Sequence, residues 1–150
     1  MKSCLGIIVA VGLTLPAFGQ SVDPLIGTWK LNLEKSSTNI AFKSLTLTWT
    51  GEGQNLIDTA DGVDAQGQPF HVVFRHIYDG QPHPTTGSPD YDSTTYTRIG
   101  NTINAVRFRQ GKPAEVGQAV IVPGKTYTFT NEGIDANNQP YHYVGVYDRQ

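Results

Sequence analysis

Cysteine is almost absent from this chain of 150 residues, and the single one is Cys4. A mature domain without that residue has no disulfide, no thiol nucleophile and no thiolate metal ligand, so its stability must come from packing. Long apolar runs are also missing. The longest, 5–15, has about half the roughly 20 residues needed to span a bilayer, so we predict no membrane span.

Charge is sparse as well. Lys and Arg number 11 against 13 Asp and Glu, and no basic patch stands out, so a nucleic-acid partner is not expected. The chain lacks a Gly-x-Ser-x-Gly elbow, a phosphate-binding glycine loop and a His-Glu-x-x-His motif. We therefore predict neither an enzyme nor a cofactor, although a carboxylate or histidine acting inside a barrel would leave no local spacing signature.

Residues 1–19 have the layout of a cleavable secretory signal. Lys2 precedes the apolar run, and the small residues Ala17 and Gly19 follow it. Cys4 lies before that run, which is the wrong place for a lipoprotein anchor. We predict cleavage after Gly19, leaving 20–150 as one exported domain, periplasmic or extracellular, whose length suits a single core.

Apolar and polar residues alternate along the rest of the chain, and turn residues interrupt the pattern about every ten positions. In GTWKLNL, for example, Trp29, Leu31 and Leu33 share one face. We predict nine strands and no helix, with the strands at 27–33, 43–49, 55–63, 69–79, 92–99, 102–110, 113–122, 125–134 and 140–148. Hairpin-length joins favour an all-β, antiparallel up-and-down meander closed into a barrel of about 8 to 10 strands over a β-sandwich.

One phrase occurs twice: DGVDAQGQPFHVV at 61–73 and EGIDANNQPYHYV at 132–144. We interpret each copy as a strand, a tight turn and the next strand. Gly67 and Asn138 then occupy equivalent turn positions, and both residue types tolerate left-handed backbone. The longest connection, 79–90, contains three prolines and two glycines, so no regular structure is expected there.

The residues GTWKL at 27–31 resemble the Gly-x-Trp signature that opens the barrel of lipocalins, fatty-acid-binding proteins and their relatives, and VYDR at 146–149 resembles their closing strand. The resemblance implies a lipocalin-like barrel with Trp29 at its floor. The longer frame DPLIGTWKLNLEKS, YDG, TGSPD and VYD also resembles a group of small secreted bacterial proteins of lipocalin-like type, which carries no known activity.

Two features of fatty-acid-binding proteins are missing. The nine residues 34–42 are too few for the helix-turn-helix lid of those proteins. Their closing strand also carries an Arg-x-Tyr motif; here Tyr147 matches the tyrosine, but Gly145 occupies the position of the arginine. We therefore do not predict cytosolic fatty-acid carriage. An exported lipocalin-like barrel remains the expectation.

A hollow barrel would be lined by the inward residues of its strands. The predicted ligand-binding wall is Trp29, Leu31, Leu47, Trp49, Phe74, Arg107, Arg109, Tyr127, Phe129, Tyr143 and Tyr147. The simpler interpretation of these residues is an ordinary packed core, because small barrels either fill with side chains or hold one small ligand.

Arg107 and Arg109 share a strand face opposite Val106 and Phe108. If the arginines point inward, they can receive an anionic ligand through two parallel hydrogen bonds. If they point outward, they form a solvated stripe. We favour the outward interpretation, because arginine is almost never buried without a partner.

No metal site is predicted from the four histidines His71, His76, His83 and His142. On a strand, a separation of five places the first two on opposite faces, and the simplest interpretation is surface histidines. The acidic residues Asp58, Asp61 and Asp64 lack the order of a calcium loop.

The predicted function is binding of a small hydrophobic or amphipathic ligand inside the barrel; the sequence specifies neither that ligand nor an oligomeric state. One alternative is a filled barrel that acts as an envelope interaction module through its outer surface or through the 79–90 loop. The other is a small barrel enzyme, an isomerase or hydrolase, which requires His and Asp or Glu side chains to converge in a pocket.

Overall fold

The computed structural model of the protein describes residues 22–37, 39, 42–135 and 137–150. The predicted signal segment 1–19 lies outside these ranges, so its cleavage stays a prediction. The described chain is all β, and no helix in it is long and apolar enough to cross a membrane.

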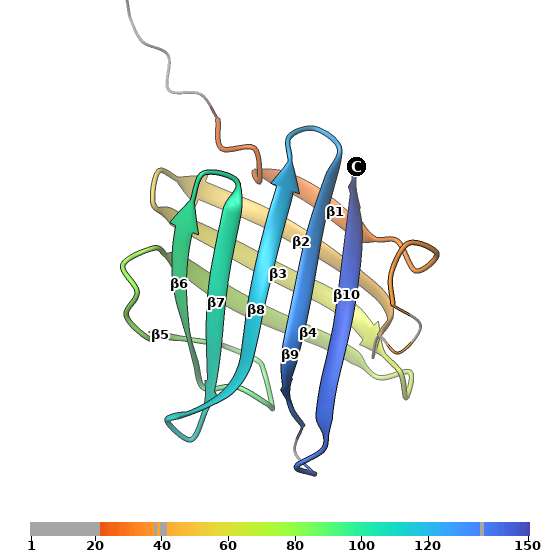
Figure 1. The fold of residues 1–150 in the computed structure, drawn as a ribbon. Helices are drawn as coiled ribbons and strands as arrows, with labels where there is room; N and C mark the ends of the chain where they lie inside the picture. Colours follow the sequence, from red (N-terminus) through yellow and green to blue (C-terminus); the bar gives the residue numbers. More distant parts are fainter. Residues whose placement is uncertain (1–21, 38, 40–41, 136) are drawn as a thin grey trace, which may run out of the picture.

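The strands are β1 (Gly27–Leu31), β2 (Phe42–Glu52), β3 (Asn55–Asp64), β4 (Pro69–Ile77), β5 (His83–Pro84), β6 (Ser93–Ile99), β7 (Thr102–Arg109), β8 (Lys112–Val122), β9 (Thr126–Ile134) and β10 (Pro140–Arg149). They form one antiparallel sheet in the order β4-β3-β2-β1-β10-β9-β8-β7-β6-β5 (Figure 1). Only the β1–β10 pair joins strands that are distant in sequence. The predicted up-and-down meander is therefore confirmed.

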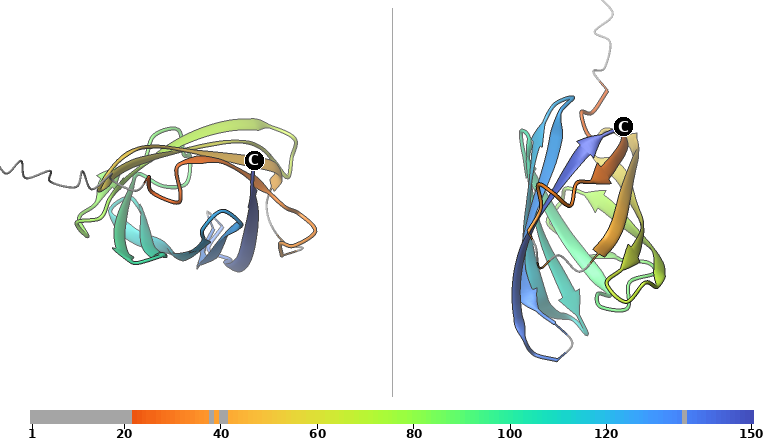
Figure 2. Two further views of the ribbon diagram at one scale, coloured as in Figure 1. Left: turned by 90° about the horizontal axis from the view of Figure 1, so that it is seen from above. Right: turned by 90° about the vertical axis from the view of Figure 1, so that its right-hand side faces the viewer.

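The sheet curves until its two ends nearly meet. Figure 2 shows β1–β4 facing β6–β10 across a flattened barrel. At the seam, Thr86 forms a two-way backbone bridge with Val73 of β4. The prediction that 79–90 has no regular structure is wrong at β5, where His83 and Pro84 pair with β6.

The repeated phrase forms two hairpins with the same turn. The backbone N–H of Asp64 donates to the carbonyl of Gln68 at 3.0 Å, and Asp135 makes the matching bond to the residue four positions on, also at 3.0 Å. Gly67 has a φ of 90° and Asn138 a φ of 59°. The prediction that both positions use left-handed backbone is confirmed, which explains why the phrase is written with Gly and Asn there.

The β2–β3, β6–β7 and β8–β9 turns lie at one end of the barrel, which we name the closed end (top in Figure 1). Buried side chains fill it. Trp29 has no exposed surface there, and its indole N–H donates to the carbonyl of Leu25 at 2.7 Å. The Arg149 guanidinium covers its ring at 5.2 Å, and Tyr127 packs against it at 6.2 Å between ring centroids. Trp29 thus occupies the floor position that the resemblance implies.

Candidate ligand-binding cavity

A cavity of about 500 Å³ occupies the rest of the interior. Its mouth lies at the open end of the barrel, between the β3–β4, β7–β8 and β9–β10 turns (bottom in Figure 1). Inward residues of β2, β3, β4, β7, β8, β9 and β10 form its wall, and 88–91 form part of its mouth. Ligand sites for small molecules span about 300–1,000 Å³, so this half of the barrel has room for one.

Eight of the eleven predicted wall residues line this cavity: Leu47, Phe74, Arg107, Arg109, Tyr127, Phe129, Tyr143 and Tyr147. The other three, Trp29, Leu31 and Trp49, are buried in the core and do not line it. Alternation shows which face a residue takes, but not how far along the barrel axis the packed part of the interior extends. Ligand contact by the eight stays a prediction.

Glycines in the repeated phrase make room for aromatic walls. Gly62 and Gly133 stand at matching inward positions, directly opposite Phe70 and Tyr141. A Cβ atom on Gly62 would lie 2.7 Å from Phe70 Cζ, and one on Gly133 would lie 2.6 Å from Tyr141 Oη. Each ring therefore rests against bare backbone, and both rings line the cavity. The two copies of the phrase thus form two parts of the cavity lining, one on β3 and β4 and the other on β9 and β10.

Arg107 points inward, so the favoured outward interpretation is wrong. Its side chain is 11% exposed and forms an ion pair with Glu115, which is 2% exposed. The rings of Phe74 and Phe129 lie 5.0 Å from the guanidinium, and that of Tyr91 lies 5.5 Å away. The partner that makes burial possible was available in the sequence, because Glu115 lies opposite Arg107 in the β7–β8 hairpin.

Glu115 and Arg107 differ in how fully they are bonded. One Glu115 oxygen accepts from Arg107, and the other accepts from the hydroxyls of Tyr91, at 2.8 Å, and Tyr141. Arg107 Nε, in contrast, is buried and has no hydrogen-bond partner among the described residues. The guanidinium is thus fixed on one side and retains a free donor on a group that lines the cavity.

Arg109 lies at the mouth, where its guanidinium donates hydrogen bonds to backbone carbonyls. Its Nε donates to the carbonyl of Asp90 at 3.0 Å, and its Nη1 donates to the carbonyl of Asp135 at 3.1 Å. These bonds tie the loop before β6 to the β9–β10 turn. Arg109 therefore shapes the opening of the cavity.

An acid and an imidazole are buried together at the inner end. The side chains of Asp58 and His76 are 8% and 6% exposed, and Oδ2 lies 3.9 Å from Nε2, too far for a hydrogen bond. Burial raises the pKa of Asp58 to about 7, against a smaller opposing effect of Arg107. Burial, followed by Arg107 and Arg98, holds the pKa of His76 well below its usual value. The pair is therefore mostly neutral below pH 7 and is not a salt bridge there.

The surface interpretation is thus wrong for His76, while it is right for His71, which is exposed and contacts Asp61 at 2.6 Å. The barrel-enzyme alternative requires a convergence of this kind, but only Asp58 of the buried pair lines the cavity. No three His, Cys, Asp or Glu side chains gather as a metal site within the described ranges.

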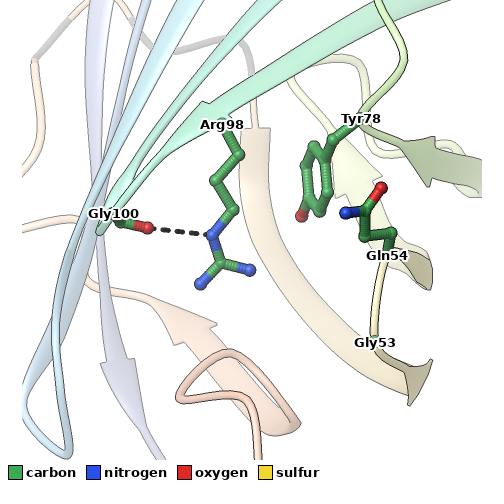
Figure 3. Close-up of a pocket in the computed structure, with 5 residues that line it drawn as sticks. All are labelled: Gly53, Gln54, Tyr78, Arg98 and Gly100. Atoms are coloured by element: carbon green, nitrogen blue, oxygen red, sulfur yellow. Dashed lines mark hydrogen bonds between the residues drawn. The ribbon is translucent and has the colours of Figure 1, made fainter.

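A second hollow, of about 410 Å³, lies outside the barrel at the closed end. Figure 3 shows its lining: Gly53, Gln54, Tyr78, Arg98 and Gly100. Arg98 Nε donates to the carbonyl of Gly100 at 3.0 Å, and Nη1 pairs with Asp23 at 2.5 Å. This hollow is open to solvent and its lining is mostly polar, so the interior cavity is the stronger candidate.

No protein-family model and no curated protein match the chain. Solved structures do match its fold. A zebrafish ileal bile acid-binding protein complexed with cholic acid has a TM-score of 0.57 at 11% identity, over 85% of this chain and 100% of that one. The fluorescent protein UnaG has a TM-score of 0.55 at 16% identity, over 83% and 96%. Rv2717c from M. tuberculosis has a TM-score of 0.52 at 15% identity, over 85% and 93%.

These similarities extend over nearly the whole of each chain at low identity, so they concern the fold. Together with the ten-stranded meander, they establish the fold as an all-β, antiparallel, lipocalin-like barrel.

Proposed function

We propose that the protein binds one small, largely apolar or amphipathic molecule inside the barrel. The observation that carries this proposal is the cavity of about 500 Å³ walled by aromatic rings. Each Å² of apolar surface removed from water contributes about 25 cal/mol, so such walls supply affinity without specific bonds. The zebrafish protein of the same fold is complexed with cholic acid, which supports this ligand class by analogy.

Arg107 orients the ligand in this proposal. Its guanidinium lines the cavity and is not fully bonded, so it can donate to a carboxylate, sulfonate or carbonyl oxygen of a ligand. Glu115 already balances the charge of the guanidinium, so the ligand need not be an anion. A polar group is expected at this level of the cavity, with the apolar remainder against the rings.

Native mass spectrometry of the mature protein, purified from its own periplasm or medium, is the first test. We expect one small molecule per chain, which denaturing extraction would release for identification. A clean apo mass, in a protein that also fails to take up hydrophobic dyes, would contradict the proposal. It would favour the interaction-module alternative. The next test would then be whether a partner protein captured by the full chain is lost when the 79–90 loop is shortened.

The role of Arg107 can be separated from general binding with 8-anilinonaphthalene-1-sulfonate, an aromatic anion whose fluorescence reports apolar sites. The double variant R107M/E115Q avoids leaving a buried charge unpaired, and we expect it to bind the dye about tenfold more weakly. The matched control is R98M/D23N, which removes the ion pair at the closed end and should leave dye affinity unchanged. Equal losses in both variants would contradict the assignment.

We also propose that the protein acts after export. The charged, apolar and small-residue order of 1–19 supports this, as does the resemblance to secreted lipocalin-like proteins. Protein recovered from the periplasm or medium is expected to begin at Gln20. An intact amino terminus on that material would contradict cleavage.

A further inference from the structure

Polar atoms without hydrogen-bond partners gather around the inner end of the cavity. They belong to Trp49, Asp58 and His76, which we name the inner polar cluster. Within the described residues, the unpartnered atoms of this cluster are the indole Nε1, the carboxyl Oδ1 and both imidazole nitrogens; buried polar atoms of Tyr78, Tyr96, Arg107 and Asn131 are also unpartnered. All three residues are at least nine-tenths buried. Most buried polar groups in proteins are bonded, so this concentration needs a physical explanation.

Packing holds the cluster in place. The His76 ring lies 4.3 Å from Trp49 and 3.8 Å from Tyr96 between centroids, and it stacks on the latter at 28°. Asp58 stands directly opposite Trp49 in the β2–β3 register and opposite Phe74 in the β3–β4 register. Neighbouring strands thus fix the carboxyl from both sides. Asp58 is the only member of the cluster that lines the cavity, so a ligand reaches the cluster through it.

The two acidic side chains buried in this wall make a direct contrast. Glu115 is bonded at both oxygens, to Arg107 and to two tyrosines. Asp58 Oδ1 has no hydrogen-bond partner in the described part of the chain, and Oδ2 is 3.9 Å from the nearest imidazole nitrogen. A leucine would fill the same space without a desolvation cost. An unbonded carboxyl on the wall of a cavity is therefore most simply explained by a partner that comes from the cavity.

We propose that Asp58 is a hydrogen-bonding subsite, and that the ligand carries an N–H or O–H donor on the end that enters the barrel first. This inference rests on the proposed function. Arg107 on β7 supplies a donor and Asp58 on β3 an acceptor to the same cavity. The ligand class is therefore an amphipathic molecule with both a donor and an acceptor on an apolar, ring-like skeleton, and a simple fatty acid does not meet that description.

The test uses two probes that differ in one donor: 2-naphthol, and 2-methoxynaphthalene, in which a methyl group replaces the hydroxyl hydrogen. Dissociation constants are measured by calorimetry with the full mature protein. We expect the unsubstituted protein to bind 2-naphthol about tenfold more tightly than its ether. The variant Asp58→Leu should bind both probes equally. The matched control Asp61→Asn removes an exposed carboxylate of the same strand that does not line the cavity, and it should keep the preference.

The outcomes separate the two proposals. A tenfold preference that disappears only in Asp58→Leu supports the subsite. Equal binding of both probes by the unsubstituted protein overturns the subsite and leaves the carrier function standing. Binding of neither probe, with no molecule retained from the native source, overturns the carrier function and the subsite with it.

A second measurement keeps the proposal testable if Asp58→Leu does not fold. Raising the pH from about 6 to about 8 ionises Asp58, and an ionised carboxylate accepts a hydrogen bond more strongly. The preference for 2-naphthol should therefore grow several-fold over this range in the unsubstituted protein, and should stay constant in the near-isosteric Asp58→Asn. A preference that does not change with pH in the unsubstituted protein would overturn the subsite.

The neighbours of Asp58 do not confuse this measurement. The titratable and charged groups around it come from β4, the residue after β4, β6, β7, β9 and β10: His76, Tyr78, Tyr96, Arg107, Tyr127 and Tyr147. The pKa of every one of these tyrosines is raised, mainly by burial, and that of the imidazole is lowered. Among Asp58 and these six neighbours, only Asp58 therefore changes its charge between pH 6 and pH 8.

Discussion

Each end of the barrel has an arginine–carboxylate pair, partly buried at the closed end and more fully buried beside the cavity, and the two pairs have different consequences. At the closed end, Arg98 gives Nη1 to Asp23 at 2.5 Å and Nε to a turn carbonyl, which fastens the segment before β1 to the β6–β7 turn. Toward the open end, Arg107 gives one donor to Glu115 and keeps Nε free. The closed end is filled by packed side chains, whereas the other half of the barrel holds the cavity. This contrast is the main argument that the hollow half is the functional one.

The largest expected effect tests whether the closed end carries the stability. Trp29→Ala removes a fully buried ring and should lower the free energy of unfolding by about 4 kcal/mol. Phe74→Ala enlarges a cavity that already exists and should cost about 1–2 kcal/mol. Urea denaturation followed by fluorescence or circular dichroism gives both values. Equal losses would contradict the division into a filled and a hollow half.

The second prediction concerns pH and the Asp58–His76 pair. The pKa of Asp58 rises from 3.8 to about 7 on folding, so its contribution to stability is lost as pH rises through that window. The pKa of His76 falls below 6.5, so its contribution is lost as pH falls below 6.5. The two trends oppose each other where these windows overlap, which should flatten the stability profile of the unsubstituted protein there.

Single substitutions should uncover each trend. In His76→Phe, the unfolding free energy should fall on the order of 3 kcal/mol between about pH 4 and pH 7, because each pKa unit corresponds to about 1.36 kcal/mol. In Asp58→Asn, it should instead rise with pH up to about 6.5. Urea denaturation at several pH values measures both slopes. Slopes of the same sign in the two variants would show that the pair is not buried in its neutral form.

The third prediction tests the glycine–aromatic walls. Gly62→Ala and Gly133→Ala place a methyl group against Phe70 and Tyr141, and we expect each to cost about 2 kcal/mol and to reduce dye uptake. Gly53→Ala is the control. Its Cβ would meet no atom within 4 Å, so only the left-handed φ of 59° costs stability, about 1 kcal/mol. Dye uptake should be unchanged in the control.

The smallest expected effect is at the mouth. Arg109→Met removes the bonds that join 88–91 to the β9–β10 turn and should cost about 1 kcal/mol. Hydrogen exchange at 88–91 should accelerate, and dye association and dissociation should quicken together with little change in affinity. A large loss of affinity would mean that Arg109 binds the ligand directly.

Strand positions followed from the sequence because alternation and turn residues report local backbone preference. All nine predicted strands are present, and the turn roles of Gly67 and Asn138 are confirmed. The sequence did not predict β5, because this strand has only two residues and lies in a proline-rich segment without apolar–polar alternation. It is recognised only from its pairing with β6, beside the seam where Thr86 meets β4.

The candidate site was less predictable, because burial depends on partners from other strands. Arg107 was expected outside since no buried counter-charge had been assigned, yet Glu115 lies opposite it in a predicted hairpin. Pairing the two strands residue by residue would have found it. Asp58 and His76 come together only through the β3–β4 register. The position of Trp49 along the barrel axis, in the packed core and not in the cavity lining, depends on packing around the whole barrel.

The Arg107–Glu115 pair also determines how the protein responds to salt. Exposed ion pairs such as Lys35–Asp148 weaken as ionic strength rises, because mobile ions screen them over about 10 Å at 0.1 M. A pair enclosed by protein is screened far less, and its opposite charges cancel within the cavity. The affinity of the barrel should therefore depend little on salinity. That property agrees with our proposal that the protein acts after export, where the cell does not control the ions around it.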